Sequence, residues 1–360
     1  MTLSNIFFGK KVVQQAYLNN ALIYKSKGWE TLPSTCTEVW TKDFGALGVI
    51  DTKIISQCVT DSNNNIYVLS NNDLFKLNSE GSFIWAQTIK GIKYVSIDSN
   101  NDVYIALAIY DYNSNPYIYI AKLDDNGNIQ KEFKANGNIA NYATNFALDD
   151  KYFYISVNYN TNYNKYFNKI DREGKIVDQI SLQLNNSTLV EADDSFLYAG
   201  LGSNLIKIDK NNISNYTVEY KIPNDYSILN IILDELGNVI VIDTTGAVYK
   251  YNFENNASIK YRERAITSNL SFTLDYQKNL YFTSDGSNGT DNAMYLIKYS
   301  SDGTLIFETK ILTDQNDSIF YGKLHVDSNG NIYYLYNKYN SGSGYSLTIK
   351  KLINIEKKGN

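Results

Sequence analysis

The stretch "VSIDSNNDVYIALAIYDYNSNPYIYIAKLDDNGNI" (residues 95–129) contains three apolar segments separated by runs of turn-forming residues. The first segment ends at Asp98, and the second begins at Val103 after an Asn-rich run. The third contains Lys122 and leads into the sequence "DDNG". Because Val, Ile and Tyr favour strands whereas Asn, Asp and Gly favour turns, the stretch predicts consecutive antiparallel strands.

The same pattern occurs seven times along the chain. In each copy an Asp follows a strand-like segment, with apolar residues mostly at one and three positions before it, such as Ile97 and Val95. The seven residues are Asp61, Asp98, Asp149, Asp193, Asp234, Asp275 and Asp327, spaced by 37, 51, 44, 41, 41 and 52 residues. This spacing is close to the period of roughly 40–45 residues expected for four-stranded propeller blades. After a variable loop, a third segment carries a recurring Lys, as in "IAKLD", and a fourth follows a second turn. We therefore predict an all-β, seven-bladed propeller of four-stranded antiparallel blades.

The two ends of the repeat array are incomplete in complementary ways. The last unit has three strand-like segments and then stops at "EKKGN", without a fourth. The segment "TEVWTKDFG" (37–45) has the pattern of a fourth strand without the other three, with Trp40 in the place that Trp85 and Phe307 hold elsewhere. A ring left open would expose strand edges. We therefore predict that 37–45 pairs with 347–355, which sets the domain boundaries at 1–36 for a leader and 37–360 for the propeller.

The leader contains "KKVVQQAYL" and "ALIYK" on either side of Asn19-Asn20, which predicts a β-hairpin with a two-residue turn. An isolated hairpin is marginal in water, so it is expected to pack on the ring, where it could plug one mouth, or on a partner.

Two resemblances follow from these motifs. Residues 37–355 resemble the seven-bladed β-propeller repeat family, whose units carry the apolar–Asp turn and an Ala–Lys–Leu–Asp run as in 95–129. That likeness is specific for the fold and says almost nothing about activity. The leader "GKKVVQQAYLNNALIY" (9–24) resembles the N-terminal segment of tail and baseplate proteins of phages that infect Gram-positive bacteria. The second resemblance implies a virion attachment element in residues 1–36 that contacts other tail or baseplate proteins.

Composition and charge exclude several classes of partner. The net charge of −5 and pI near 5.1 argue against nucleic-acid binding. No apolar run approaches ~18 residues, so no membrane span is expected. The start, "MTLSNIFFGKK", lacks a basic n-region, so we expect no classical signal peptide. A virion protein released by host lysis fits these features.

Few residues point to catalysis or to a cofactor. His325, the sole histidine, precedes Asp327 in a strand and is interpreted as a packed blade residue. Cys36 and Cys58 are interpreted as free thiols. The "DSNNN"-type turns have oxygen ligands in alternation, but their sixth residue is apolar and their twelfth is not Glu, so Asx turns are favoured over calcium loops. We predict no metal, no cofactor and no catalytic residues.

The loops between the second and third strands differ in length. They are long in blades two, three, six and seven and are rich in Tyr, Asn, Ser, Asp and Gly, the residue types typical of recognition surfaces. In propellers these loops emerge on one face, where the four long ones would form a crescent. The predicted ligand-binding residues are Tyr110, Tyr112, Asn113, Tyr117, Tyr159, Asn160, Tyr163, Tyr166, Asp285, Asn288, Asp291, Tyr339, Asn340 and Tyr345.

The favoured function is a receptor-binding protein of a phage tail fibre or baseplate that recognises a cell-wall polysaccharide or teichoic acid of a Gram-positive host without catalysis. The acidic charge counts against a polyanion and leaves neutral sugars open. Two alternatives stay open, a polysaccharide-degrading or lyase-type propeller enzyme and a structural scaffold of the tail.

Overall fold

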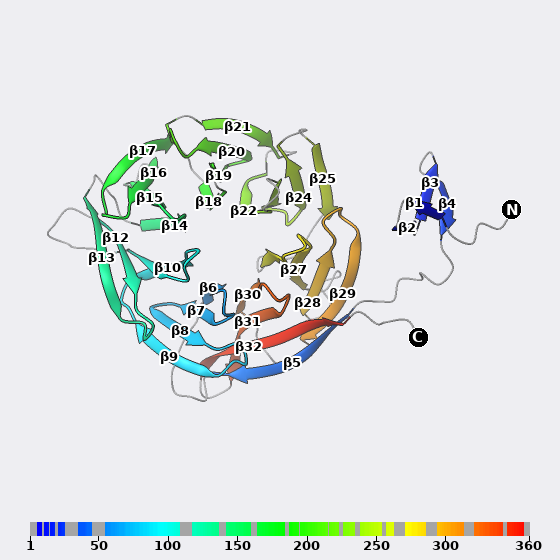
Figure 1. Ribbon diagram of the computed structural model, residues 1–360, viewed down its shortest axis with the longest axis horizontal. Coiled ribbons are helices and arrows are strands. Elements are labelled where there is room, and N and C mark those ends of the chain that lie inside the picture. The colour runs from blue at the N-terminus through cyan, green and yellow to red at the C-terminus, as the bar shows by residue number, and fades with distance from the viewer. Residues whose placement is uncertain are drawn as a thin grey trace.

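The chain forms a ring of β-sheets in a computed structural model (Figure 1). Strands are the regular elements of the described residues, and no helix occurs among them, which confirms the predicted all-β class. The structure describes residues 6–8, 11–13, 15–18, 21–25, 35–44, 55–108, 117–136, 142–159, 164–183, 187–193, 195–214, 216–222, 226–234, 238–253, 257–262, 271–285, 294–312, 320–340 and 344–355.

Seven sheets of four antiparallel strands make up the ring, as the repeat predicts. In blades 1 to 6 the strands follow one another along the chain, from the innermost to the outermost (Figure 1). Blades 1 to 3 consist of β6 (Ile55–Thr60), β7 (Ile66–Ser70), β8 (Asp73–Leu77), β9 (Phe83–Thr88), β10 (Ile92–Ile97), β11 (Val103–Ala108), β12 (Tyr117–Leu123), β13 (Ile129–Asn136), β14 (Tyr142–Leu148), β15 (Tyr152–Tyr159), β16 (Asn164–Asp171) and β17 (Ile176–Gln183). Blades 4 to 6 consist of β18 (Ser187–Ala192), β19 (Phe196–Leu201), β20 (Asn204–Asp209), β21 (Tyr216–Lys221), β22 (Ile228–Leu233), β23 (Asn238–Asp243), β24 (Val248–Asn252), β25 (Ala257–Arg262), β26 (Phe272–Leu274), β27 (Leu280–Asp285), β28 (Met294–Tyr299) and β29 (Leu305–Leu312).

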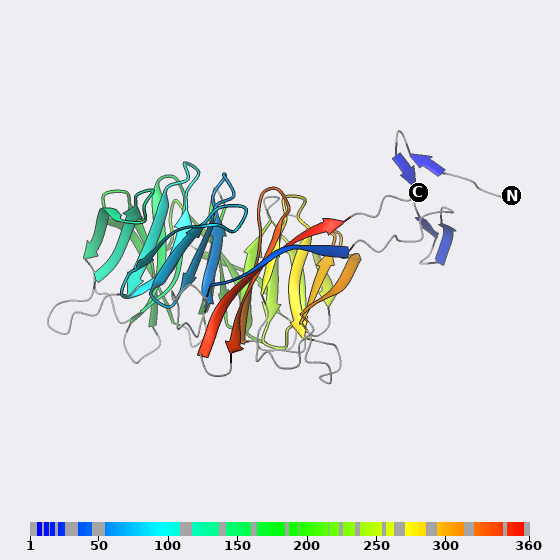
Figure 2. The ribbon, with the colours of Figure 1, turned by 90° about the horizontal axis from the view of Figure 1, so that it is seen from below.

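Blade 7 is assembled from both ends of the chain. Its first three strands are β30 (Phe320–Val326), β31 (Ile332–Asn340) and β32 (Gly344–Ile355), and its outermost strand is β5 (Thr35–Asp43). The two strands from opposite ends are antiparallel, with Asp43 opposite Thr348 and Thr35 opposite Ile355. Figure 2 shows them crossing the outside of the ring together. The pairing is the one predicted from Trp40, but β5 begins and ends two residues earlier than the predicted segment.

The leader contains two separate hairpins. β3 (Gln15–Leu18) pairs with β4 (Ala21–Lys25), and Leu18 lies opposite Ala21, as the turn at 19–20 predicts. The predicted first strand, 10–18, is divided, because β2 (Lys11–Val13) pairs instead with β1 (Ile6–Phe8). Gly9 separates those two short strands in the sequence, and glycine favours a turn over a continued strand. Both hairpins are drawn outside the ring in Figure 1.

The repeated Asp closes the turn between the first and second strands of its blade. One oxygen of Asp61 accepts hydrogen bonds from the backbone N–H of Asn63 and Asn65, each at 2.9 Å. The other accepts from the Asn65 side chain at 2.8 Å and from the Tyr67 hydroxyl at 3.3 Å. Asp275 and Asp327 are held in the same way. The Asx-turn prediction is therefore confirmed: the carboxylates are bound to their own turns.

An aromatic side chain of the fourth strand packs on a turn glycine of the next blade. Trp85 of blade 1 lies over Gly127 of blade 2, and Trp40 of blade 7 lies over Gly81 of blade 1. Both glycines have positive φ, +81° and +72° respectively. A Cβ on either would meet the indole ring within 3.0 Å. Glycine is therefore required both by the turn and by the approach of the ring.

The recurring lysines of the third strands also join neighbouring blades. Lys250 donates to the carbonyl of Ser301 at 3.1 Å, and Lys351 donates to the carbonyl of Ser79 at 2.9 Å. Each acceptor lies in the second turn of the following blade. The apolar core divides in the same way, into seven described clusters that each lie where two blades meet. The sequence repeat therefore encodes the contacts between blades as well as the blades themselves.

Candidate functional site in the central channel

The innermost strands share an irregularity that shapes the channel wall. In β6, β10, β14, β18, β22 and β30 the register with the second strand shifts near the start of the strand, which marks a β-bulge. Bulges bend a strand and change where its side chains point. In each of these inner strands the bulge lies at the end opposite the Asp turn, beside the last residues of the second strand; in blade 2 Ile92 lies opposite Leu107.

Side chains four positions before the repeated Asp satisfy backbone N–H groups at these bulges. Within its own strand, Asn145 accepts from the N–H of Phe146 at 2.7 Å, and Asn230 accepts from that of Ile231 at 2.9 Å. In two other blades the acceptor serves the next strand around the ring: Gln57 accepts from Val95 at 2.9 Å, and Ser271 accepts from Leu324 at 2.7 Å. Polar residues at this position therefore hold the inner wall together, because buried N–H groups need acceptors.

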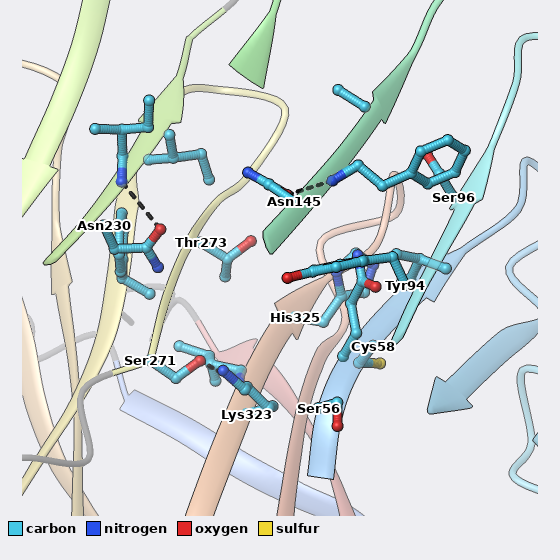
Figure 3. Close-up of a pocket in the computed structure, with 18 of the residues that line it drawn as sticks. Ser56, Cys58, Tyr94, Ser96, Asn145, Asn230, Ser271, Thr273, Lys323 and His325 are labelled. Carbon is cyan, nitrogen blue, oxygen red and sulfur yellow. Dashed lines mark hydrogen bonds between the residues drawn. The ribbon is translucent and has the colours of Figure 1, made fainter. Parts of the chain in front are cut away.

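These strands enclose a cavity of about 480 Å³ (Figure 3). Its volume lies in the range of small-molecule pockets. Described residues that line it come from β6, β10, β14, β22, β26 and β30. The polar ones are Ser56, Gln57, Tyr94, Ser96, Asn145, Asn230, Ser271, Thr273, Lys323 and His325. Hydroxyl and amide groups thus dominate the polar lining, and no carboxylate lines the cavity among the described residues.

His325 lies on β30 with its ring in the channel wall (Figure 3). Its Nε2 is 2.8 Å from the hydroxyl oxygen of Thr60, the last residue of β6. Burial lowers the pKa of His325 to about 4, although Asp327 acts in the opposite direction. The imidazole is therefore neutral at neutral pH and is held by a partner in blade 1. This agrees with a packed residue, and the structure adds that it faces the cavity.

Lys323 lies two residues before His325 on the same strand, so both lie on the same face of β30. It is half-buried and forms no ion pair with a described residue. Burial lowers its pKa. The neighbouring imidazole of His325 is neutral, so it does not lower the pKa of Lys323 further. Lys323 is therefore the one charged side chain in the described lining.

Both cysteines are free thiols, as predicted. Cys58 lines the cavity, and burial raises its pKa. Cys36 lies on β5, and burial raises its pKa to about 11. Both thiols are therefore protonated at neutral pH, which makes them poor nucleophiles. Among the described residues, no group of three or more His, Cys, Asp or Glu side chains could hold a metal ion.

The predicted loop residues fall into two groups. Seven of them lie outside the described residues: Tyr110, Tyr112, Asn113, Asn160, Tyr163, Asn288 and Asp291. The other seven lie in strands, where the second strand ends or the third begins: Tyr117, Tyr159, Tyr166, Asp285, Tyr339, Asn340 and Tyr345. Tyr339 is paired with Tyr345 in blade 7, and Tyr159 with Asn164 in blade 3. The strands thus extend further than the loop boundaries predicted from sequence, because Tyr supports continued strand pairing.

Tyr166 lies within the third strand of blade 3, β16. Its backbone is paired on both sides, with Val157 and Ser181. Its ring is half-buried and packs against the apolar cluster between blades 2 and 3. Tyr166 therefore contributes to the core between blades 2 and 3.

Sequence reasoning did not identify the channel residues as a site. A signal was present, because the position four residues before the Asp is apolar in one copy, Leu189, and polar in the other six: Gln57, Tyr94, Asn145, Asn230, Ser271 and Lys323. The mixture of residue types hid it, since those side chains meet only when the ring is assembled.

Among the residues that the structure describes, no helix is long and apolar enough to cross a membrane. No protein-family model matches the chain, and no curated protein matches it.

Solved structures resemble the chain in fold. A streptogramin B lyase matches with a TM-score of 0.61 and 12% identity over 88% of this chain and 98% of that one. Virginiamycin B lyase from Staphylococcus aureus matches with a TM-score of 0.60 and 14% identity over 89% of this chain and 100% of that one. Hsv2 from Kluyveromyces lactis matches with a TM-score of 0.56 and 9% identity over 84% of this chain and 99% of that one. At these identities the likeness concerns the propeller fold alone.

Proposed function

We propose that the protein is a non-catalytic binding module that takes a saccharide unit of a host cell-wall glycan at the mouth of its channel. The observation that carries this proposal is the channel lining. It combines hydroxyl and amide groups from several blades with aromatic residues, Tyr94, Phe146 and Phe272, in a cavity of about 480 Å³. Sugars present hydroxyl groups to such donors and acceptors, and a few convergent polar groups in a pocket give orientation and specificity.

The four long loops belong to the same proposal. The bulged ends of the inner strands lie beside the ends of the second strands, from which those loops continue; in blade 2, for example, Ile92 lies opposite Leu107. A glycan chain with one unit in the channel mouth would pass over that face. The Tyr- and Asn-rich loop residues then serve as a second contact zone.

The leader gives the context that we propose for this binding. Residues 9–24 resemble attachment segments of phage tail and baseplate proteins, so we infer that residues 1–36 fix the propeller to a virion and that the ring is the displayed part. This context rests on the resemblance of the leader sequence, and the hairpin β3–β4 agrees with it.

A pull-down with purified Gram-positive cell walls tests the proposed function. Ser96→Trp places a large side chain in the channel wall and should abolish retention of the full chain. Ser214→Trp adds the same side chain at an exposed turn of blade 4 and should leave retention unchanged. Equal retention of both variants would contradict the channel proposal. The triple variant Tyr112→Ala, Tyr163→Ala, Tyr345→Ala measures the contribution of the loops, and a loss confined to this variant would place the site there instead.

A lyase-type enzyme is a second candidate, favoured by one observation. Lys323 and His325 face one cavity from the same strand, and a lysine whose pKa is lowered can act as a base or a nucleophile. Incubation of the wild-type chain with the same cell walls, followed by measurement of released reducing ends and unsaturated products, tests this candidate. Product release that is lost in Lys323→Met would favour the enzyme over the binding module. A chain that is neither retained nor active fits the third alternative, a tail scaffold.

A further inference from the structure

Lys323 has no carboxylate partner among the described residues, whereas three lysines inside other blades have one. Lys210 lies 2.6 Å from Asp149, Lys250 lies 3.2 Å from Asp234, and Lys298 lies 3.7 Å from Asp275. The side chains of these three lysines are at most 12% exposed. A fourth buried lysine, Lys169, donates to the backbone carbonyl of Lys210, and its Nζ lies 4.0 Å from the centroid of the Tyr152 ring. Each of these four ammonium groups inside the blades therefore has a described protein partner. Lys323, in contrast, lies in the cavity lining.

The groups around Lys323 are arranged as donors. The hydroxyl oxygen of Ser271, directly before the adjacent inner strand β26, accepts from the backbone N–H of Leu324, and its own proton remains able to donate. The side-chain oxygen of Asn230, one blade further, accepts from the N–H of Ile231, and its Nδ2 group remains able to donate to a ligand. Figure 3 shows Asn230, Ser271 and Lys323 along one side of the cavity. Hydrogen bonds within the wall therefore use one acceptor lone pair of each oxygen, and the Ser271 hydroxyl proton and the Asn230 Nδ2 group remain able to donate to a ligand.

A desolvated ammonium group beside unused donors is unfavourable without an anion. The burial that lowers the pKa of Lys323 reflects that cost. A bound anionic group would compensate the charge and accept the hydrogen bonds of Ser271 and Asn230. Charge-assisted hydrogen bonds are the strongest polar contacts that such a site can make.

We propose that Lys323, Ser271 and Asn230 bind a single anionic group of the glycan, so that the channel selects an acidic unit over a neutral one. This inference rests on the proposed function and names its ligand class. The group is either the carboxylate of a uronic acid or the phosphate of a teichoic acid, since both offer one charge and several acceptor oxygens. The net negative charge of the protein does not oppose this, because the described lining contains no carboxylate. Glu191, at the position of His325 in blade 4, has a side chain outside the described residues.

Isothermal titration of the full chain tests the proposal with three probes: a galacturonic acid disaccharide, the neutral galactose disaccharide and glycerol 3-phosphate. We expect wild-type protein to bind one of the two anions at least about tenfold more tightly than the neutral sugar. Lys323→Met should remove that preference, so that the variant binds the anion no more tightly than the neutral sugar. Lys90→Met removes an exposed lysine with the same change in net charge and should retain the preference.

The outcomes separate the two proposals. A wild-type protein that binds the neutral sugar as tightly as both anions overturns the anionic site but keeps the saccharide site. Binding of none of the three probes overturns both. A preference that persists in Lys323→Met overturns the role of Lys323. The melting temperature of Lys323→Met gives an independent readout: removal of an uncompensated charge should leave it equal to that of the wild type or higher, and a clear decrease would mean that Lys323 has a structural partner and is not held for a ligand.

Discussion

The contact between Trp40 and Gly81 joins β5 of blade 7 to the second turn of blade 1, and a comparison of glycine substitutions measures it. Gly81 has φ +72° with the Trp40 ring 2.7 Å from the position of an added Cβ. Gly202 has φ +60° with nothing within 4 Å of that position. Gly81→Ala and Gly202→Ala therefore share the backbone cost of a left-handed residue, about 1–2 kcal/mol. Only Gly81→Ala adds a clash with a packed ring, which costs about 1–3 kcal/mol more.

These magnitudes convert into melting temperatures. For 360 residues, an unfolding entropy of about 2.1 cal/mol/K per residue gives roughly 1.3 °C per kcal/mol. Gly81→Ala should therefore melt roughly 1–4 °C below Gly202→Ala when both are followed by far-ultraviolet circular dichroism.

The double variant Trp40→Ala, Gly81→Ala completes the test. Because Trp40→Ala removes the ring that the new Cβ would meet, the second substitution should cost less in that background than in the wild type, and the two changes should not be additive. Equal melting of the two glycine variants, or full additivity with Trp40→Ala, would show that the ring does not bear on this turn. It would also remove the packing reason for β5 as the outer strand of blade 7.

Three further predictions follow from single contacts. Tyr333→Phe removes the hydroxyl that donates to buried Asp327 at 3.0 Å, so the free energy of unfolding measured with denaturant should fall by about 1–3 kcal/mol. The control Tyr276→Phe, at a residue that is 63% exposed, should leave that free energy unchanged. The pKa of His325 is about 4 in the folded chain and near 6.5 in the unfolded chain, so between these pH values the unfolded chain binds more protons and stability should fall as the pH decreases. His325→Gln should reduce the dependence of the melting temperature on pH in this range. An unchanged dependence would contradict the burial of the ring. Both thiols should react with a disulfide reagent at least about tenfold faster in urea than in the native chain, because burial raises the pKa of Cys36 and Cys58 and limits the access of the reagent. Equally fast labelling of the native protein would contradict the packing of the two thiols.

The fold could be predicted because its information is local and repeated. Each Asp binds its own turn, and each copy of the turn looks alike in sequence, so counting Asp61 to Asp327 counts the blades. The identity of β5 could be predicted for a different reason. Trp40 must lie on a glycine turn, as Trp85 does, and that requirement leaves a recognisable aromatic position. Loop boundaries failed where Tyr-rich segments continued as strands, as at Tyr339 and Tyr345.

The channel could not be predicted, because its properties depend on residues brought together from different blades. In one strand Ser271 is an ordinary small polar residue; in the ring it accepts from Leu324 of the next blade and lies beside Lys323. Blade 7 also departs from the repeat at the bulge itself. Gly322 stands there, and an added Cβ would clash with the hydroxyl of Tyr334. The strand that carries Lys323 and His325 is thus shaped by a close contact within its own blade, and a pattern averaged over the seven copies conceals the one copy that carries the charged lysine.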